Sequence, residues 1–181
     1  MRKIKTRQLA LDAMLAAMCA VLGYLSLDLG NLKITFESVP ILIGALLFGP
    51  ADGAAVGFVG TLIYQLLRYG VSATTLLWIL PYVLCGLLVG LYTKRRGFSL
   101  TRGQMVRIIV ANELLITALN TVVLYIDSKL YGYYSAAFIF GSLALRVVIC
   151  VGKALAYAFT LPPLLQALRR GVRVGRNGGA A

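Results

Sequence analysis

Six runs of apolar residues dominate the sequence and limit the kind of fold that the chain can adopt. They cover Leu9–Leu27, Phe36–Phe48, Ala51–Leu67, Ala73–Tyr92, Val106–Ile126 and Ala136–Leu168. Each run is continuously apolar rather than alternating with polar residues, which favours membrane helices over the strands of a membrane barrel. We therefore expect an all-α integral membrane protein built as a six-helix transmembrane bundle.

The composition supports a protein that is solvated mainly by the lipid bilayer. Hydrophobic residues make up 60% of the 181 residues, charged residues make up 13%, and the mean hydropathy is +0.85. Soluble domains carry about 25% charged residues, so the polar side chains of this chain are too few to cover a surface in water. A multi-pass membrane protein follows.

The basic residues indicate the orientation of the chain. Three clusters hold most of the 18 lysines and arginines, and they lie before the first run, between the fourth and fifth runs, and in the Gly-rich tail. Cytoplasmic loops of membrane proteins are enriched in Lys and Arg, so both termini are predicted to be cytoplasmic. The net charge of +12 is read as this topology signal, and no nucleic-acid partner is expected.

The same pattern predicts three parts of the chain. Residues 1–8 form a basic cytoplasmic N-terminus, residues 9–168 form the six-helix membrane domain, and residues 169–181 form a basic, disordered cytoplasmic tail. The run Phe36–Phe48 is short, because at ~1.5 Å per residue it reaches about 20 Å of a ~30 Å hydrocarbon core. It and the next run are predicted to be short, tilted spans or a re-entrant hairpin.

The residues needed for catalysis or metal binding are missing from the sequence. It has no histidine, its three cysteines are isolated, and no Walker A motif or pair of catalytic carboxylates is present. We expect a protein that is not an enzyme and has no cofactor or metal. A structural or assembly membrane protein without a ligand is one alternative, and an enzyme acting on lipids is a less favoured one.

Two cations inside the last apolar run point to a binding site. Arg146 and Lys153 are seven residues apart, which places them on one helix face about 10 Å from each other. Charged side chains at membrane depth normally face the bundle interior or a cavity. Lys153 is predicted to pair with Glu113 of the fifth run or to line the site, whereas Arg146 suits a carboxylate or an aromatic ring of a ligand.

Aromatic and amide side chains in the outer half of the chain complete the candidate site. Trp78 and Tyr82 are four residues apart on one helix face, and Asn120 lies on a polar stripe of the fifth run. Aromatic walls with one cation suit a flat, acidic small molecule. The predicted substrate-binding residues are Arg146, Asn120, Trp78, Tyr82, Phe36, Tyr64 and Lys153.

Small residues on two of the runs predict close helix packing, because they let helix backbones approach in lipid. Gly53, Gly57 and Gly60 of the third run are predicted to pack within the bundle. The small face of the first run is longer than the bundle requires. Its residues Ala13, Ala17 and Ala20 are predicted to contact a second membrane protein.

Several stretches resemble the substrate-binding S-component of energy-coupling factor (ECF) vitamin transporters, and the folate group is the most similar. They are ALDAMLAAMCAVL in the first run, VPILIGALLFGPADGAAVGFVGTLI across the second and third, and LNTVVLY with ALRVVICVGKAL across the last two. The resemblance implies a six-helix bundle with an outward-facing vitamin site in the bacterial cytoplasmic membrane. It also implies a transmembrane coupling subunit that meets Ala13 and Ala17, and two ATPase subunits.

The function implied by this resemblance is the capture of a vitamin for ATP-driven uptake by the partner subunits. The vitamin is folate or a related anionic or aromatic compound. The chain departs from the folate group at Gly60–Thr61, where an acidic residue often follows the glycine. Pantothenate, another acidic vitamin, a pterin-like compound and a nucleobase relative therefore stay open as substrates.

Overall fold

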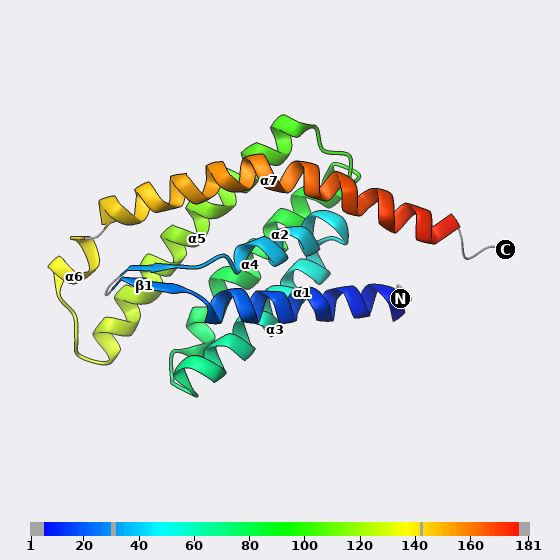
Figure 1. The fold of residues 1–181 in the computed structure, drawn as a ribbon. Helices are drawn as coiled ribbons and strands as arrows, with labels where there is room; N and C mark the ends of the chain where they lie inside the picture. Colours follow the sequence, from blue (N-terminus) through cyan, green and yellow to red (C-terminus); the bar gives the residue numbers. More distant parts are fainter. Residues whose placement is uncertain (1–5, 30–31, 142, 178–181) are drawn as a thin grey trace.

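The computed structural model describes residues 6–29, 32–141 and 143–177 as seven helices and one short hairpin (Figure 1). The elements in chain order are α1 (Thr6–Tyr24), β1 (Leu27–Leu29), β2 (Leu32–Ile34), α2 (Ser38–Leu47), α3 (Pro50–Tyr69), α4 (Thr75–Arg95), α5 (Arg102–Leu130), α6 (Ala136–Phe140) and α7 (Leu143–Asn177). The two strands are antiparallel, with Asp28 opposite Lys33.

The predicted fold class, a six-helix membrane bundle, is confirmed. The six apolar runs correspond to α1, α2, α3, α4, α5 and the α6–α7 segment. Within the described residues, α1, α4, α5 and the part of α7 up to Leu168 are long and apolar enough to cross a membrane. The first turn of α1 and the last turn of α7 lie at the same end of the bundle (Figure 1), as expected if both termini are cytoplasmic.

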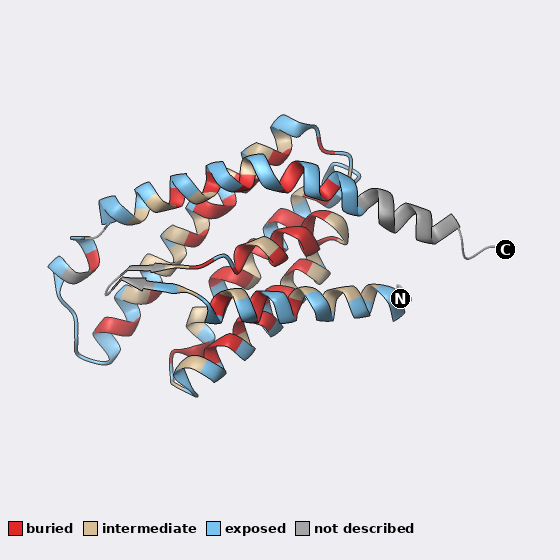
Figure 2. Cartoon of the chain, viewed as in Figure 1, coloured by how far each residue is buried: buried red, intermediate tan, exposed pale blue. Residues whose placement is uncertain are grey.

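Apolar side chains cover the outside of the bundle. The outer faces of α1 and α7 are largely exposed (Figure 2), and Val148 and Phe159 of α7 are 66% and 77% exposed. Such a surface is unfavourable in water, whereas lipid tails solvate it. The exposure pattern therefore agrees with a protein that faces lipid on its periphery.

Helix α2 lies in the middle of the bundle rather than at its edge. Nearly all of its residues are buried, including the whole segment 40–46, and it packs against α1, α3, α4 and α7. A helix that is apolar on every side lies in a protein core or spans a membrane. With ten residues, or about 15 Å, α2 is shorter than a membrane span, and the hairpin and the following extended residues lead the chain into it.

Close backbone contacts hold α3 against its neighbours. A Cβ added to Gly86 of α4 would lie 2.4 Å from the carbonyl oxygen of Gly53, and one added to Gly60 would lie 2.5 Å from the Cβ of Cys19 in α1. Neither distance leaves room for a side chain. The prediction that the glycines of the third run serve packing is therefore confirmed.

Two boundaries differ from the prediction. The last run is divided into two helices, because α6 ends at Phe140 and α7 begins at Leu143. Helix α7 continues to Asn177, through most of the segment for which the sequence predicts a disordered tail. Extending an existing helix avoids the cost of nucleation, and the Leu, Ala and Arg residues beyond Leu164 favour a helix. Residues 178–181 lie outside the described residues.

We expect Gly86→Ala to destabilise the bundle, because its new methyl group would overlap the backbone of Gly53. Overpacking of this kind costs about 1–3 kcal/mol. The matched control is Gly152→Ala in α7, where a Cβ meets nothing within 4 Å and where alanine favours the helix. Thermal unfolding in detergent measures both variants. An unchanged midpoint for Gly86→Ala would contradict the close α3–α4 contact.

Candidate functional site

A cavity of about 680 Å³ opens in the half of the bundle away from the termini. Its walls come from the last turns of α3, the first turns of α4, the second half of α5 and the first turns of α7. The residues leading into α2 and the connection between α5 and α6 complete the lining. The connection between α3 and α4 contributes Ser72 and Thr74. Four helices and three connecting segments therefore meet around one space, as in the ligand pockets of helical bundles.

Two aromatic side chains that line the cavity donate hydrogen bonds to the same carboxylate, that of Asp127. The indole Nε1–H of Trp78 in α4 donates a hydrogen bond to Asp127 Oδ1 of α5, with 3.3 Å between the two atoms. The hydroxyl of Tyr133, in the connection between α5 and α6, donates to the other oxygen of Asp127. Asp127 thus fixes an aromatic side chain on each side of itself, and all three residues line the cavity.

The Tyr133 hydroxyl is suited to remain a donor. Partial burial and the adjacent carboxylate of Asp127 both raise the pKa of this phenol above its ordinary value. The phenol accordingly stays protonated at neutral pH, and its hydrogen bond to Asp127 persists.

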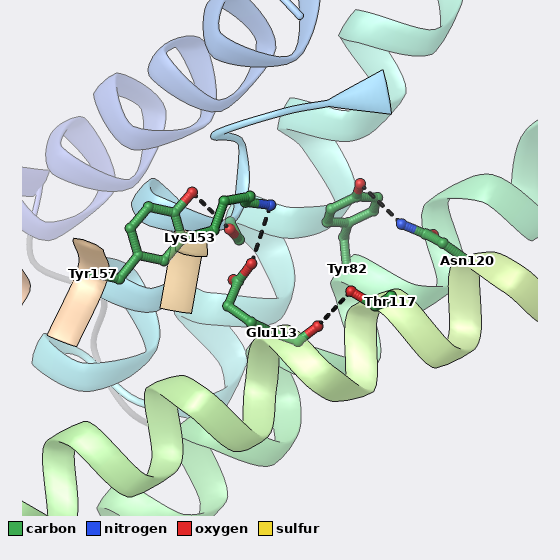
Figure 3. A network of polar contacts seen from close by, with 7 residues as sticks. Tyr82, Glu113, Thr117, Asn120, Lys153 and Tyr157 are labelled. Carbon is green, nitrogen blue, oxygen red and sulfur yellow. Dashed lines mark hydrogen bonds and ion pairs between the residues drawn. The ribbon is translucent and has the colours of Figure 1, made fainter. Parts of the chain in front are cut away.

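A second polar group lies deeper, where α4 and α5 face the residues before α2. The side-chain amide of Asn120 donates through Nδ2 to the hydroxyl of Tyr82, at 3.3 Å (Figure 3). The hydroxyl of Tyr82 also lies beside the side chains of Thr35 and Glu37. Glu37 is only 1% exposed, yet it lines the cavity. A buried carboxylate is thus part of the cavity wall.

The side chain of Glu37 fits into the bundle because residue 23 is a glycine. A Cβ added to Gly23 of α1 would lie 2.8 Å from Glu37 Oε2 and 2.8 Å from the ring of Tyr64. Glu37 and Tyr64 therefore pack directly against the α1 backbone. Any larger residue at position 23 would displace a side chain that lines the cavity.

Helix α7 provides the cations. Lys153 Nζ forms an ion pair with Glu113 Oε2 at 3.1 Å (Figure 3), and Glu113 is 1% exposed. The prediction that Lys153 pairs with Glu113 is therefore confirmed, and Lys153 lines the cavity as well. Arg146 is half-buried and lies seven residues before Lys153 on α7. It also lines the cavity. Both cations therefore face the interior of the bundle. This is expected, because a charged side chain that faces lipid is unfavourable in free energy.

The structure brings together six of the seven residues predicted to bind a substrate. Those that line the cavity are Tyr64, Trp78, Tyr82, Asn120, Arg146 and Lys153. Phe36 does not line it; its ring is 41% exposed and meets the ring of Tyr157 edge to face, with the ring centres 6.4 Å apart. The neighbours Thr35 and Glu37 line the cavity instead.

The prediction of binding residues omitted Glu37 and Asp127, although both carboxylates line the cavity. A signal was present in the sequence, because an acid at the edge of an apolar run is costly in a membrane and is a candidate functional residue.

Within the described residues, no three cysteine or acidic side chains are grouped to hold a metal ion.

The alanines predicted to meet a partner do not all share one face of α1. Ala13 and Ala17 are exposed on the surface of the bundle. Ala20 is buried with Ala16 and Cys19, on the side of α1 that meets Gly60 of α3. Ala13 and Ala17 are therefore accessible to a partner in this structure, whereas Ala20 belongs to the packing within the bundle.

The comparisons with known proteins concern the family and the fold. A family model described as "ECF transporter, substrate-specific component" matches residues 7–172 of the chain. Among solved structures, the chain is similar to the S-component for biotin from an ECF-type ABC transporter. The TM-score is 0.69 at 18% sequence identity, and 91% of each chain is covered. Comparison with curated protein sequences gives no match.

We expect Lys153→Met to destabilise the protein by about 3–5 kcal/mol, because it leaves the buried carboxylate of Glu113 without its cation. The double variant Lys153→Met with Glu113→Gln should recover most of this loss, since no uncompensated charge remains. Lys94→Met, at an exposed position, is the control and should change stability little. Thermal unfolding in detergent provides the comparison. A double variant as unstable as Lys153→Met would contradict the coupling of the pair.

Proposed function

The chain belongs to the family of ECF transporter substrate-specific components, and from this premise we propose that it captures a vitamin-like small molecule for ATP-driven uptake. The family is that of a transport component, and the protein is a multi-pass membrane protein. The proposed substrate is folate or a related vitamin that is anionic or aromatic. The proposed location is the bacterial cytoplasmic membrane.

The observation that carries this proposal is the composition of the cavity wall. Trp78, Tyr64 and Tyr82 provide aromatic surface, and Arg146 provides a cation within the same space of about 680 Å³. This volume falls within the range of small-molecule pockets, which is about 300–1,000 Å³. A guanidinium binds carboxylates through paired, charge-assisted hydrogen bonds, so a flat molecule with an acidic group suits the site.

Two other vitamins are candidates for the same cavity. Biotin is the ligand named for the structurally similar S-component, and it combines a ring with a carboxylate. Pantothenate has a carboxylate but no ring. These compounds therefore belong in any binding assay together with folate.

The proposed partners are a transmembrane coupling subunit and two ATPase subunits. The exposed alanines Ala13 and Ala17, one turn apart on α1, support contact with the coupling subunit. Small residues spaced in this way allow the backbone of another membrane helix to approach closely. Energy for uptake would then come from ATP hydrolysis in other chains.

The first test of the function follows the single tryptophan, because Trp78 lines the cavity. We expect folate, biotin or pantothenate to change Trp78 fluorescence saturably, with one molecule bound per protein, and calorimetry to give the same affinity. Arg146→Gln should weaken binding about tenfold or more, because it removes a charge-assisted hydrogen bond. A folded protein that binds none of the vitamins by either method would overturn the proposed function.

The partner contact is tested separately from the ligand site. We expect Ala13→Leu with Ala17→Leu to abolish co-purification with the coupling subunit, since two larger side chains would hold the helices apart. Vitamin binding by the isolated variant should remain unchanged. Ala111→Leu, at an exposed position of α5, is the control and should leave co-purification intact. Normal assembly of the double variant would show that this face of α1 is not the contact.

A further inference from the structure

Tyr133 lies at an opening of the cavity. It belongs to the connection between α5 and α6, at the end of the bundle away from the termini (Figure 1). Its side chain lines the cavity, and yet the residue is 44% exposed. A side chain with both properties separates the cavity from the space outside the bundle, so its contacts bear on how a solute reaches the site.

The phenol of Tyr133 is bonded to a carboxylate that a second helix holds in place. Asp127 Oδ2 accepts its hydrogen bond, while Asp127 Oδ1 accepts the 3.3 Å hydrogen bond from the indole Nε1–H of Trp78. Trp78 lies in the first turn of α4 and Asp127 lies in the last turn of α5. The carboxylate therefore joins two helices to the connection between α5 and α6.

Helix stability does not account for an acid at position 127. The last turn of a helix carries a partial negative charge and favours cations over anions. Asp127 is also only 8% exposed, and burial makes a charged group more costly. What the acid provides here is the pair of hydrogen bonds from Trp78 and Tyr133, which are stronger than bonds to a neutral acceptor.

Tyr134 anchors the connection to α5, so the side chain of Tyr133 can move without the backbone around it. The ring of Tyr134 meets the ring of Tyr125 edge to face, with the ring centres 5.6 Å apart. Lys129 Nζ lies 3.9 Å from the centre of the Tyr134 ring. Gly132, directly before Tyr133, has a φ of +75° and open space where a Cβ would be. Exposed side chains change rotamer within nanoseconds, so the phenol can turn outward when its contacts break.

We propose that Tyr133 is a side-chain gate of the cavity and that Asp127 is the positioning residue that holds this gate closed. Trp78 fixes the carboxylate from α4, so the phenol closes against a rigid acceptor. A solute passes when the hydrogen bond between Tyr133 and Asp127 breaks and the phenol turns away from the cavity. The inference concerns access to the cavity and does not depend on which solute binds there.

Access is measured with a thiol placed inside the cavity. The parent protein carries Ile149→Cys, at a position of α7 that lines the cavity, and Cys150→Ala, which removes the neighbouring thiol. The full chain is placed in lipid nanodiscs and treated with 2-sulfonatoethyl methanethiosulfonate, an anionic thiol reagent that does not enter lipid. Peptide mass spectrometry gives the rate of modification at position 149.

We expect Tyr133→Phe in this parent to increase the modification rate about tenfold or more, because the closed gate is held by a hydrogen bond to a charged group. Asp127→Asn should increase the rate by a smaller factor, since a neutral acceptor holds the phenol less strongly. The double variant should be no faster than Tyr133→Phe alone, because both changes act on the same hydrogen bond.

The matched control is Tyr134→Phe, which makes the same chemical change at the next residue. Tyr134 does not line the cavity, and phenylalanine keeps its ring contacts, so the modification rate should stay that of the parent. An unchanged rate in Tyr133→Phe, or an equal rise in both variants, overturns the gate. If Asp127→Asn does not fold, Tyr133→Phe decides alone, because its site is exposed.

Binding kinetics tell a gate from a ligand contact. For any of folate, biotin and pantothenate that binds, Tyr133→Phe should raise the association and dissociation rate constants by the same factor and leave the Kd unchanged. A rise in the dissociation rate constant alone would make Tyr133 a ligand contact and would overturn the gate. Because thiol modification needs no ligand, a protein that binds none of the three overturns the proposed function without affecting that result.

Discussion

The close approach of α3 to α1 and α4 is the contact on which the rest of the structure depends. In lipid, apolar burial gives little drive for helices to associate, so packing at short range has to hold them together. Gly53, Gly60 and Gly86 lack the side chains that would prevent this approach. The resulting group of helices encloses α2 and places Tyr64 and Tyr82 toward the cavity.

The two halves of the bundle differ in how their interior is filled. Toward the termini, residues of α2, α4, α5 and α7 form a continuous apolar core that includes Leu46, Ile109 and Leu165. Toward the other end, α5 and α7 separate from α3 and α4 around the cavity, and polar side chains line it. A tightly packed base thus supports an open, polar site. This arrangement suits a subunit that binds a solute on one side of the membrane.

Charged side chains inside the bundle gather around the cavity. Glu113 pairs with Lys153, and Asp127 accepts hydrogen bonds from Trp78 and Tyr133. Glu37, directly before α2, and Arg146 of α7 line the same cavity. Because charged side chains inside a membrane bundle are costly, their concentration here makes this cavity the candidate functional site.

The sequence alone sufficed for the class of fold, the approximate limits of the helices and six of the residues that line the cavity. Continuous apolar runs permit little other than membrane helices, and a cation at membrane depth such as Arg146 has to face the interior. The burial of α2 was not predictable, because it depends on packing against α1, α3, α4 and α7. It was also not predictable that Glu37 rather than Phe36 lines the cavity, or that Ala20 is buried. Each turns on the direction of one side chain, which the neighbouring helices fix and the local sequence does not.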